Sequence, residues 1–357
     1  MLPTNTAIAL LIMMVCHIIL INSFEHPSKE EEEEVKLVSV VFRHGDRTPD
    51  TIYPKILYDN SIYTDGIGEL IDQGKRRVSQ LGEKLRERYN KFLGPIYHPG
   101  DVYTRSTDFT RTKMTLQFVL ESLYPNNNLP IPITFEPRKK DKLLLRMYYC
   151  KLFTDIYENL KTEKLIQADL KGFDQIENEM SKKTGWSMND VYDLYIFYCN
   201  LVCLKYMNKT LPTWTNEKLN VLENSTFTLH NLMNYNNKLK KLNGGALLKK
   251  VTKDMQSVAY GSKKKTKIFL YSGHDLNVYA MLAALNVVKP HLPEFTSAVI
   301  IELYTIEEAY YVRVLHYLGI PSEMKTVDIP NCASPCALEA FYNSIEDVIP
   351  SNEEFNC

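Results

Sequence analysis

Runs of apolar, β-branched residues mark strand candidates at both ends of the chain. Val35–Phe42 has the length and composition of a strand that is buried on both faces, as in a parallel sheet. The other strand candidates are Val102–Thr104, Ile133–Glu136, Ile268–Ser272, Val299–Thr305 and Tyr310–His316. The last two are separated only by Ile306–Ala309, which predicts a hairpin.

Apolar residues at helical spacing predict helices between these runs. From Leu70 to Phe92 apolar side chains recur with charges between them, and the pattern ends near Gly94-Pro95. A second helix is expected over about Asp108 to Leu123, and residues 143–242 are mostly helical in pattern. Strand and helix alternation around a helical middle predicts an α/β fold.

We therefore expect a mostly parallel sheet with helices on both faces, plus an inserted, smaller, mainly helical domain. The α/β domain is expected to be discontinuous, over residues 35–142 and 246–357, with residues 143–245 as the insertion. Composition agrees with an ordinary globular protein, with 45% hydrophobic and 24% charged residues in a chain of 357. With a net charge of -1, the chain lacks the excess of basic residues that is typical of nucleic-acid binders.

The N-terminus predicts a secretory signal peptide over residues 1–23. Residues 1–24 contain no Asp, Glu, Lys or Arg, and Ile8 to Ile21 is apolar except for His17. The alternative is a membrane anchor, but the run is shorter than the ~20 residues that a spanning helix needs. We expect a secreted protein without an anchor in its mature form, with the lysosomal lumen as the alternative location.

Six cysteines remain when Cys16 is removed with the signal peptide. They are Cys150, Cys199, Cys203, Cys332, Cys336 and Cys357. An even count in an exported protein favours disulfides, whose pairing the residues leave open. Free thiols, or a metal site at Cys332 and Cys336, are the alternatives, although zinc would need more Cys or His ligands nearby.

Two sequons fit export as well. Asn208-Lys-Thr210 and Asn224-Ser-Thr226 match the glycosylation pattern, which predicts that this region lies at the surface.

The candidate chemistry begins directly after the first strand, at Arg43-His44-Gly45-Asp46-Arg47-Thr48-Pro49. Ligands of open α/β sheets bind at the carboxyl ends of strands. Arginine offers planar donors for phosphate oxygens, and histidine serves as a nucleophile or a general acid and base. A solvated basic loop is the alternative, but it does not account for an apolar strand that delivers all three side chains together.

Two further strand ends carry similar groups. Arg105 lies at the end of the second strand, within Arg105-Ser106-Thr107-Asp108, and His274-Asp275 follows the late strand Ile268–Ser272. Taken alone, Arg105 would be interpreted as a surface salt-bridge residue, and Arg111 as a structural residue in a helix-face ion pair. Three such strand ends together indicate one anion site.

These motifs resemble those of the histidine acid phosphatase family, notably its secreted and lysosomal members such as prostatic and venom enzymes. The family signature Arg-His-Gly-x-Arg-x-Pro is met by Arg43–Pro49, Arg-Ser-Thr-Asp by Arg105–Asp108, and the late His-Asp by His274-Asp275. The order and spacing fit over essentially the whole mature chain. Thr210–Trp214 after a sequon and the Cys332-x-x-x-Cys336 pair add to the likeness.

The resemblance implies a phosphomonoesterase that needs neither a metal nor another cofactor. His44 would attack phosphorus and become a phosphohistidine, and Asp275 would protonate the leaving alcohol. The phosphoryl oxygens would be held by Arg43, Arg47, Arg105 and His274. The arginines should lower the pKa of His44, and the need for a protonated Asp275 predicts an acidic optimum.

The resemblance also implies two disulfides, Cys150–Cys357 and Cys332–Cys336. A third family bridge normally joins a cysteine near Cys203 to one just before the late Glu-Leu-Tyr strand, but Ser297–Tyr304 contains no cysteine. The pairing of Cys199 and Cys203, including a local bridge between them, stays open.

Two other functions compete with this interpretation. One keeps the fold and changes the substrate, as in an inositol-phosphate phosphatase or a phosphoglycerate-mutase-like enzyme. The other is a secreted glycoprotein binder that has lost activity, although every candidate catalytic residue is present. The expected partners are small phosphomonoester substrates, and the resemblance also admits a homodimer.

Overall fold

The computed structural model describes residues 33–56, 60–127, 129–261 and 266–357. The expected signal peptide, including Cys16, lies outside the described residues. Within them an eight-stranded sheet has the order β3-β2-β4-β1-β5-β6-β7, and β8 pairs with β6. The strands are β1 Glu34–Arg43, β2 Val102–Ser106, β3 Thr134–Phe135, β4 Ile268–Gly273, β5 Ala298–Ile306, β6 Ala309–Tyr317, β7 Met324–Val327 and β8 Cys336–Ala337.

The two halves of the sheet differ in strand direction. The pairs β2–β3, β2–β4 and β1–β4 are parallel, whereas β5, β6, β7 and β8 are joined by antiparallel pairs. Because β6 points the same way as β1 to β4, most strands share one direction, as expected. The predicted hairpin is confirmed as β5–β6, with Ala298 opposite Tyr317.

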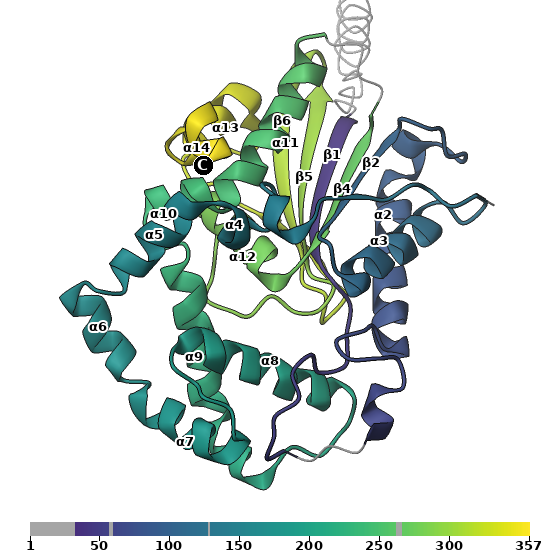
Figure 1. Ribbon diagram of the computed structural model, residues 1–357. Helices are drawn as coiled ribbons and strands as arrows, with labels where there is room; N and C mark the ends of the chain where they lie inside the picture. Colours follow the sequence, from purple (N-terminus) through teal and green to yellow (C-terminus); the bar gives the residue numbers. More distant parts are fainter. Residues whose placement is uncertain (1–32, 57–59, 128, 262–265) are drawn as a thin grey trace, which may run out of the picture.

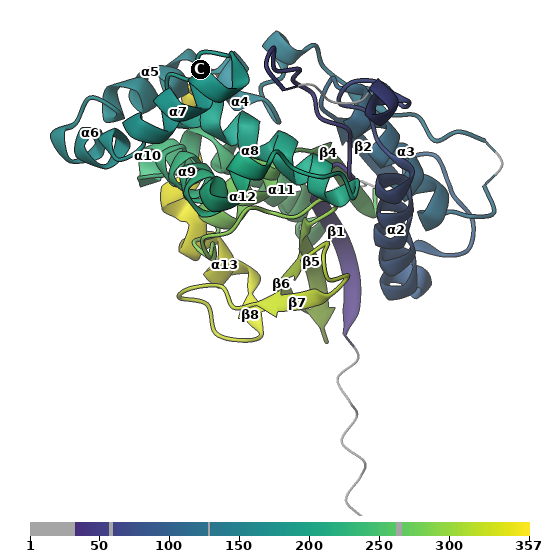
Figure 2. The same cartoon turned by 90° about the horizontal axis from the view of Figure 1, so that it is seen from below.

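Helices cover both faces of the sheet, which confirms the α/β class (Figures 1 and 2). On one face Val38, Val40 and Phe42 of β1 pack in a core with residues of two helices. On the other face Leu37 and Val41 pack in a core with residues of three helices. The first pair is α2 Asp72–Leu93 and α3 Thr110–Leu123, and the second group is α11 Gly244–Ala259, α12 Asp275–Ala284 and α13 Leu338–Ile345.

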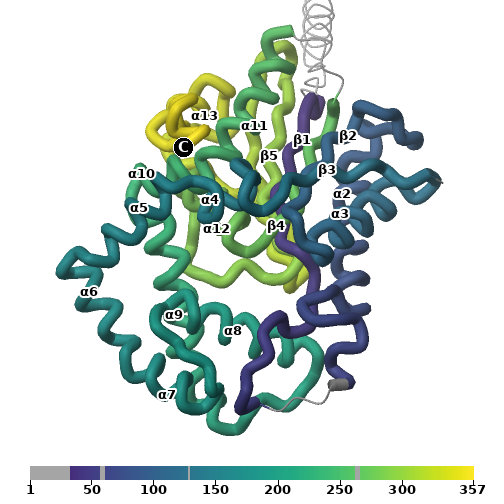
Figure 3. The backbone as a smooth tube through the Cα atoms, viewed as in Figure 1, coloured from purple at the N-terminus to yellow at the C-terminus, as the bar shows by residue number. Residues whose placement is uncertain are grey.

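The middle of the chain is helical, and a large part of it lies beyond the carboxyl end of β1 (Figure 3). Its helices are α4 Arg146–Tyr149, α5 Lys151–Leu160, α6 Lys164–Lys171, α7 Asp174–Thr184, α8 Val191–Tyr206, α9 Leu219–Leu232 and α10 Asn237–Leu242. The chain after β1 runs down to this layer. There the ring of Tyr53 lies 5.1 Å from that of Phe197, measured between centroids. The division into two domains stays a prediction, and its expected boundary between residues 245 and 246 falls inside α11.

The remaining short elements complete the fold. They are α14 Asn352–Asn356 and the 3-10 helices η1 Asn60–Tyr63, η2 Arg138–Lys140, η3 Thr213–Lys218 and η4 Glu346–Val348. None of the helices in the described residues is long and apolar enough to cross a bilayer.

The structure contains both disulfides that the resemblance implies. Cys150 is bonded to Cys357, and Cys332 to Cys336. Cys199 and Cys203 are buried free thiols on α8, so they form no local bridge. Asn208 and Asn224 are both exposed, as their sequons predict, and their glycosylation stays a prediction.

The loop after β1 is held by a close backbone contact with the start of α2. A Cβ atom built on Gly74 would lie 2.6 Å from the backbone nitrogen of Asp46 and even closer to its carbonyl oxygen. Across this contact the Ile71 backbone N–H donates to the Asp46 carbonyl at 3.1 Å. Glycine at position 74 therefore allows the helix to fix the position of residues 43–49.

We predict that Gly74→Ala lowers the free energy of unfolding by about 1–3 kcal/mol, because the added methyl group overlaps backbone atoms that have no room to move. Urea unfolding measures this change. The matched control is Gly172→Ala, at an exposed helix end with ordinary φ, where the methyl group meets only the Asp169 carbonyl oxygen at 3.1 Å. Equal losses in the two variants would contradict this account.

Candidate active site

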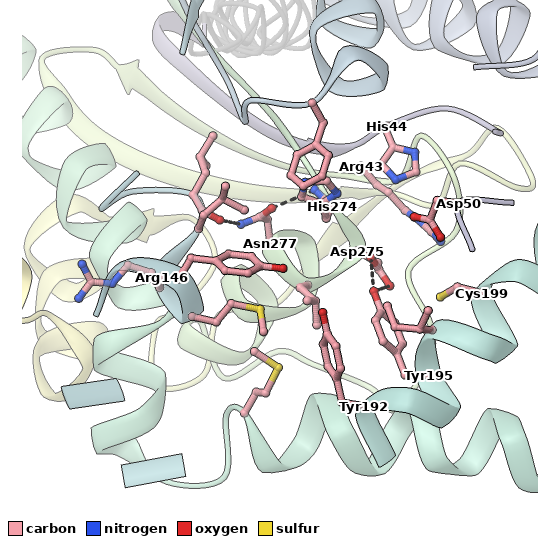
Figure 4. A pocket seen from close by; sticks show the side chains of 18 of the residues that line it. Arg43, His44, Asp50, Arg146, Tyr192, Tyr195, Cys199, His274, Asp275 and Asn277 are labelled. Carbon is pink, nitrogen blue, oxygen red and sulfur yellow. Dashed lines mark hydrogen bonds between the residues drawn. The ribbon is translucent and has the colours of Figure 1, made fainter. Parts of the chain in front are cut away.

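Parallel pairing of β1 with β4 brings two histidine-containing segments to one edge of the sheet. Arg43 pairs with Gly273, so His44 and His274 leave the sheet side by side. The backbone N–H of His44 donates to the Gly273 carbonyl at 3.0 Å, and the two imidazole centroids lie 5.5 Å apart. Both histidines line a cavity of about 180 Å³ that is closed from the other side by the helical layer (Figure 4).

His44 presents a bare nitrogen toward this cavity. Its Nδ1 lies 2.8 Å from the carbonyl oxygen of Gly45, and a carbonyl only accepts, so Nδ1 carries the hydrogen. Burial lowers the pKa of His44 well below its usual value, and the charges of Arg111 and Arg43 lower it further. The imidazole is therefore neutral, with the lone pair of Nε2 available as a nucleophile.

Three arginines, of which Arg43 and Arg47 are buried and Arg111 is partly buried, surround this histidine with positive charge. Arg43, Arg47 and Arg111 all line the cavity, and the Nε of each has no hydrogen-bond partner among the described residues. Arg43 donates to the Pro293 carbonyl at 2.5 Å. Three guanidinium groups that line one cavity offer several charged donors, so the geometry fits an anion with several acceptor oxygens.

One carboxylate partly balances these arginines. Asp50 Oδ2 lies 3.1 Å from Arg47 Nη2 and 3.6 Å from Arg111 Nη2. Its backbone N–H donates to the side-chain oxygen of Asn200 on α8 at 2.8 Å. Asp50 thus ties the loop after β1, the helix α3 and the helical layer together at the cavity.

The expectation that Arg105 holds the anion is contradicted by its position. Strand β2 continues to Ser106, so Arg105 still lies within the sheet, opposite Tyr271 of β4. Its Nη2 forms an ion pair with the fully buried Asp141 at 2.8 Å, and it does not line the cavity. Arg111, expected from its sequence position to be structural, lines the cavity from the first turn of α3.

Asp275 begins α12 and lies across the cavity from the loop of His44. The hydroxyl of Tyr195 on α8 donates to its two carboxylate oxygens at 3.1 and 3.0 Å. His230 Nε2 of α9 lies 3.7 Å from Asp275 Oδ2. Burial by itself raises the pKa of the Asp275 carboxyl, but Arg43, His230 and His274 outweigh it and hold the pKa below its usual range.

His274 is fixed by contacts on all sides. Its Nε2 lies 3.1 Å from the hydroxyl of Thr107, and its ring meets that of Phe109 edge-on at 5.0 Å. Its backbone N–H donates to the side chain of Asn277, which in turn donates to the Leu144 carbonyl. Burial, then Arg111, lowers the pKa of His274 to about 3, so its ring is neutral.

Four residues of the site were not predicted from the sequence to belong to it: Asp50, Arg111, Tyr195 and His230. Arg111 follows the second motif closely, and its place in the first turn of a helix after a strand is the one signal that could have found it. Tyr195 and His230 come from α8 and α9, where no sequence motif marks them. The described residues contain no group of three or more His, Cys, Asp or Glu side chains placed to hold a metal ion.

Comparison with known proteins identifies the family and the fold. Residues 34–317 match the family model of the histidine phosphatase superfamily, branch 2. The venom acid phosphatase of Apis mellifera is 40% identical, over 91% of this chain and 88% of that protein, and the human prostatic acid phosphatase is 32% identical over 91% and 88%. The apo phytase of Hafnia alvei has the same fold, with a TM-score of 0.68 at 16% identity over 91% of this chain and 98% of that one.

We predict that Arg111→Gln weakens the binding of inorganic phosphate about 10- to 100-fold, because a charge-assisted hydrogen bond to the anion is lost. Arg105→Gln should instead lower the free energy of unfolding by about 3–5 kcal/mol, since it leaves the buried Asp141 carboxylate without its cationic partner.

Titration calorimetry and urea unfolding separate the two effects. The double variant Arg105→Gln/Asp141→Asn serves as the control and should recover much of the stability while it binds phosphate normally. If the double variant loses phosphate binding and Arg111→Gln keeps it, the assignment of the third arginine is wrong.

Proposed function

The chain belongs to branch 2 of the histidine phosphatase superfamily, and on that premise we propose that it is an acid phosphatase that works through a phosphohistidine at His44. The observation that carries this proposal is the bare Nε2 of His44 in one cavity with three arginines and Asp275. The cavity of about 180 Å³ is small for a ligand site, which favours small phosphomonoesters or the phosphoryl end of larger ones.

In the first step, Nε2 of His44 attacks phosphorus and the bond from phosphorus to the ester oxygen breaks. The protonated Asp275 gives its proton to that oxygen, so the alcohol leaves neutral. Arg43, Arg47 and Arg111 stabilise the charge that spreads over the equatorial oxygens, and His274 lies beside them as a further phosphate contact.

In the second step, water attacks the phosphohistidine and the bond between nitrogen and phosphorus breaks. The Asp275 carboxylate accepts the proton of the attacking water, which restores the acid for the next cycle. Inorganic phosphate leaves, and His44 returns to its neutral form. Neither step draws on a metal ion.

An acidic optimum follows from the two ionisations. The pKa of His44 lies well below its usual value, so acid does not easily protonate the nucleophile. Asp275 must carry a proton, and because its pKa is held low, the protonated fraction falls as pH rises. The negative charge of a bound phosphate favours the protonated carboxyl and brings this ionisation into the working range.

The proposal places the enzyme outside the cell, with the lysosomal lumen as the alternative. Support comes from the apolar, uncharged residues 1–23, the two disulfides and the exposed Asn208 and Asn224 as glycosylation sites. Relatives named as venom, prostatic and lysosomal acid phosphatases agree with both locations.

The purified protein should hydrolyse a chromogenic phosphate ester at about pH 5, with no loss of rate in EDTA. His44→Ala should lower kcat about 10⁴-fold or more, because no nucleophile replaces the imidazole. Rapid quench with a ³²P-labelled ester should trap a phosphoenzyme in the wild type only. Inactivation by EDTA, or a phosphoenzyme in His44→Ala, would contradict the proposal.

The role of Asp275 predicts a dependence on the leaving group. Asp275→Asn should slow hydrolysis of an alkyl phosphate about 10²- to 10⁴-fold, because the alkoxide leaves without a proton. An aryl phosphate with an acidic phenol should be affected much less during phosphoenzyme formation. Equal effects on the two esters would show that Asp275 is not the proton donor.

A further inference from the structure

We propose that His230 is a positioning residue that shares one proton with Asp275 and so keeps the acid loaded for the leaving alcohol. This inference rests on the proposed function and deepens it. The two side chains come from separate layers, His230 from α9 and Asp275 from α12, and both are buried.

The tautomer of His230 follows from a single contact. Its Nδ1 lies 2.7 Å from the backbone carbonyl oxygen of Thr226, which only accepts hydrogen bonds. Nδ1 therefore carries the hydrogen, and in the neutral ring Nε2 is a bare acceptor. This Nε2 is buried and has no hydrogen-bond partner among the residues that the structure describes.

The carboxylate oxygen that faces this nitrogen is also a hydrogen-bond acceptor. Nε2 lies 3.7 Å from Oδ2 of Asp275, a separation longer than a formed hydrogen bond. A bare nitrogen and an ionised carboxylate repel each other, and one proton between them turns the repulsion into a charge-assisted hydrogen bond. The pair therefore has a built-in place for one proton, on either atom.

No neighbouring group supplies that proton. The Tyr195 hydroxyl already donates to the carboxylate, and the rings of Tyr195 and Tyr279 pack against His230 at 5.7 and 4.7 Å between centroids. The hydroxyl of Tyr279 donates away, to Asn231, at 2.6 Å. The titratable and charged groups that act on this pair are Arg43, Tyr195, Cys199, His274, Tyr279 and His291.

The shared proton balances over the catalytic cycle. The loaded pair gives its proton to the ester oxygen as that oxygen leaves phosphorus, and it becomes neutral His230 facing the Asp275 carboxylate. When water attacks the phosphohistidine, the pair takes up one proton from that water and is loaded again. No proton is gained or lost over a turnover, apart from those of substrate and product.

The shared proton explains how Asp275 can act as an acid beside positively charged groups. Arg43, His230 and His274 hold the pKa of the Asp275 carboxyl down, so the carboxyl gives up its proton early as pH rises, and His230 is the neighbouring base that can keep it. Because His230 Nε2 can also hold this proton, the pair of His230 and Asp275 stays protonated to a higher pH than Asp275 would alone. Without His230 the alkaline limb of the pH profile should move to lower pH.

The test uses two variants of His230 and two esters. His230→Phe removes the basic nitrogen and keeps a ring, and His230→Gln keeps hydrogen bonding but holds no extra proton. For an alkyl phosphate, both should move the alkaline limb of kcat/KM down by about one pH unit or more. Phosphoenzyme formation from 2,4-dinitrophenyl phosphate, whose phenol leaves without a proton, should show a smaller shift.

The matched control is His316→Phe, a partly buried histidine on β6 outside this site, which should leave the alkaline limb in place. A second measurement tests the proposal even if the His230 variants fold poorly. The ¹⁵N chemical shifts of the His230 ring report its protonation, and they should differ between the wild type and Asp275→Asn.

Three outcomes separate the claims. If the wild type forms a phosphoenzyme but both His230 variants keep its alkaline limb, the shared proton is wrong and the proposed function stands. An unchanged His230 signal in Asp275→Asn leads to the same conclusion. If the wild type hydrolyses neither ester, the proposed function itself fails.

Discussion

The parallel pairing of β1 with β4 is the constraint on which the site depends. Its register places Arg43 opposite Gly273, so the loop of the nucleophile and the start of α12 leave the sheet at the same point. The pairing is stabilised by apolar cores on both faces of β1. The stability of the sheet and the reactivity of its edge are therefore supplied by different residues of the same strands.

The helical layer completes the site by adding groups that the sheet lacks. The sheet edge and α3 contribute three cations and two neutral histidines, and burial reduces the screening of their charges by water. The α8 and α9 helices bring Tyr195 and His230 to the acid, at contact distances set by the packing of the two layers. The groups that recognise the anion thus lie on the sheet side of the cavity. The groups that control the proton of Asp275 come from both sides.

Much of this arrangement could be predicted from local patterns. The strands β1 and β4, the hairpin β5–β6 and the clusters at Arg43–Pro49 and His274-Asp275 are visible because each lies within a short stretch. Arg105 was misassigned because the end of β2 was placed too early, and one or two residues decide whether a side chain lies in the sheet or at its edge. Tyr195 and His230 depend on tertiary packing between helices, which no local pattern encodes.

The stereochemical course at phosphorus tests the central claim most directly. A phosphoryl donor made chiral with oxygen isotopes would be offered to the enzyme together with an alcohol acceptor, and the configuration of the transferred group determined. Two successive displacements, first by His44 and then by the acceptor, predict overall retention. Inversion would mean a single direct displacement, and it would contradict a phosphohistidine in this cavity.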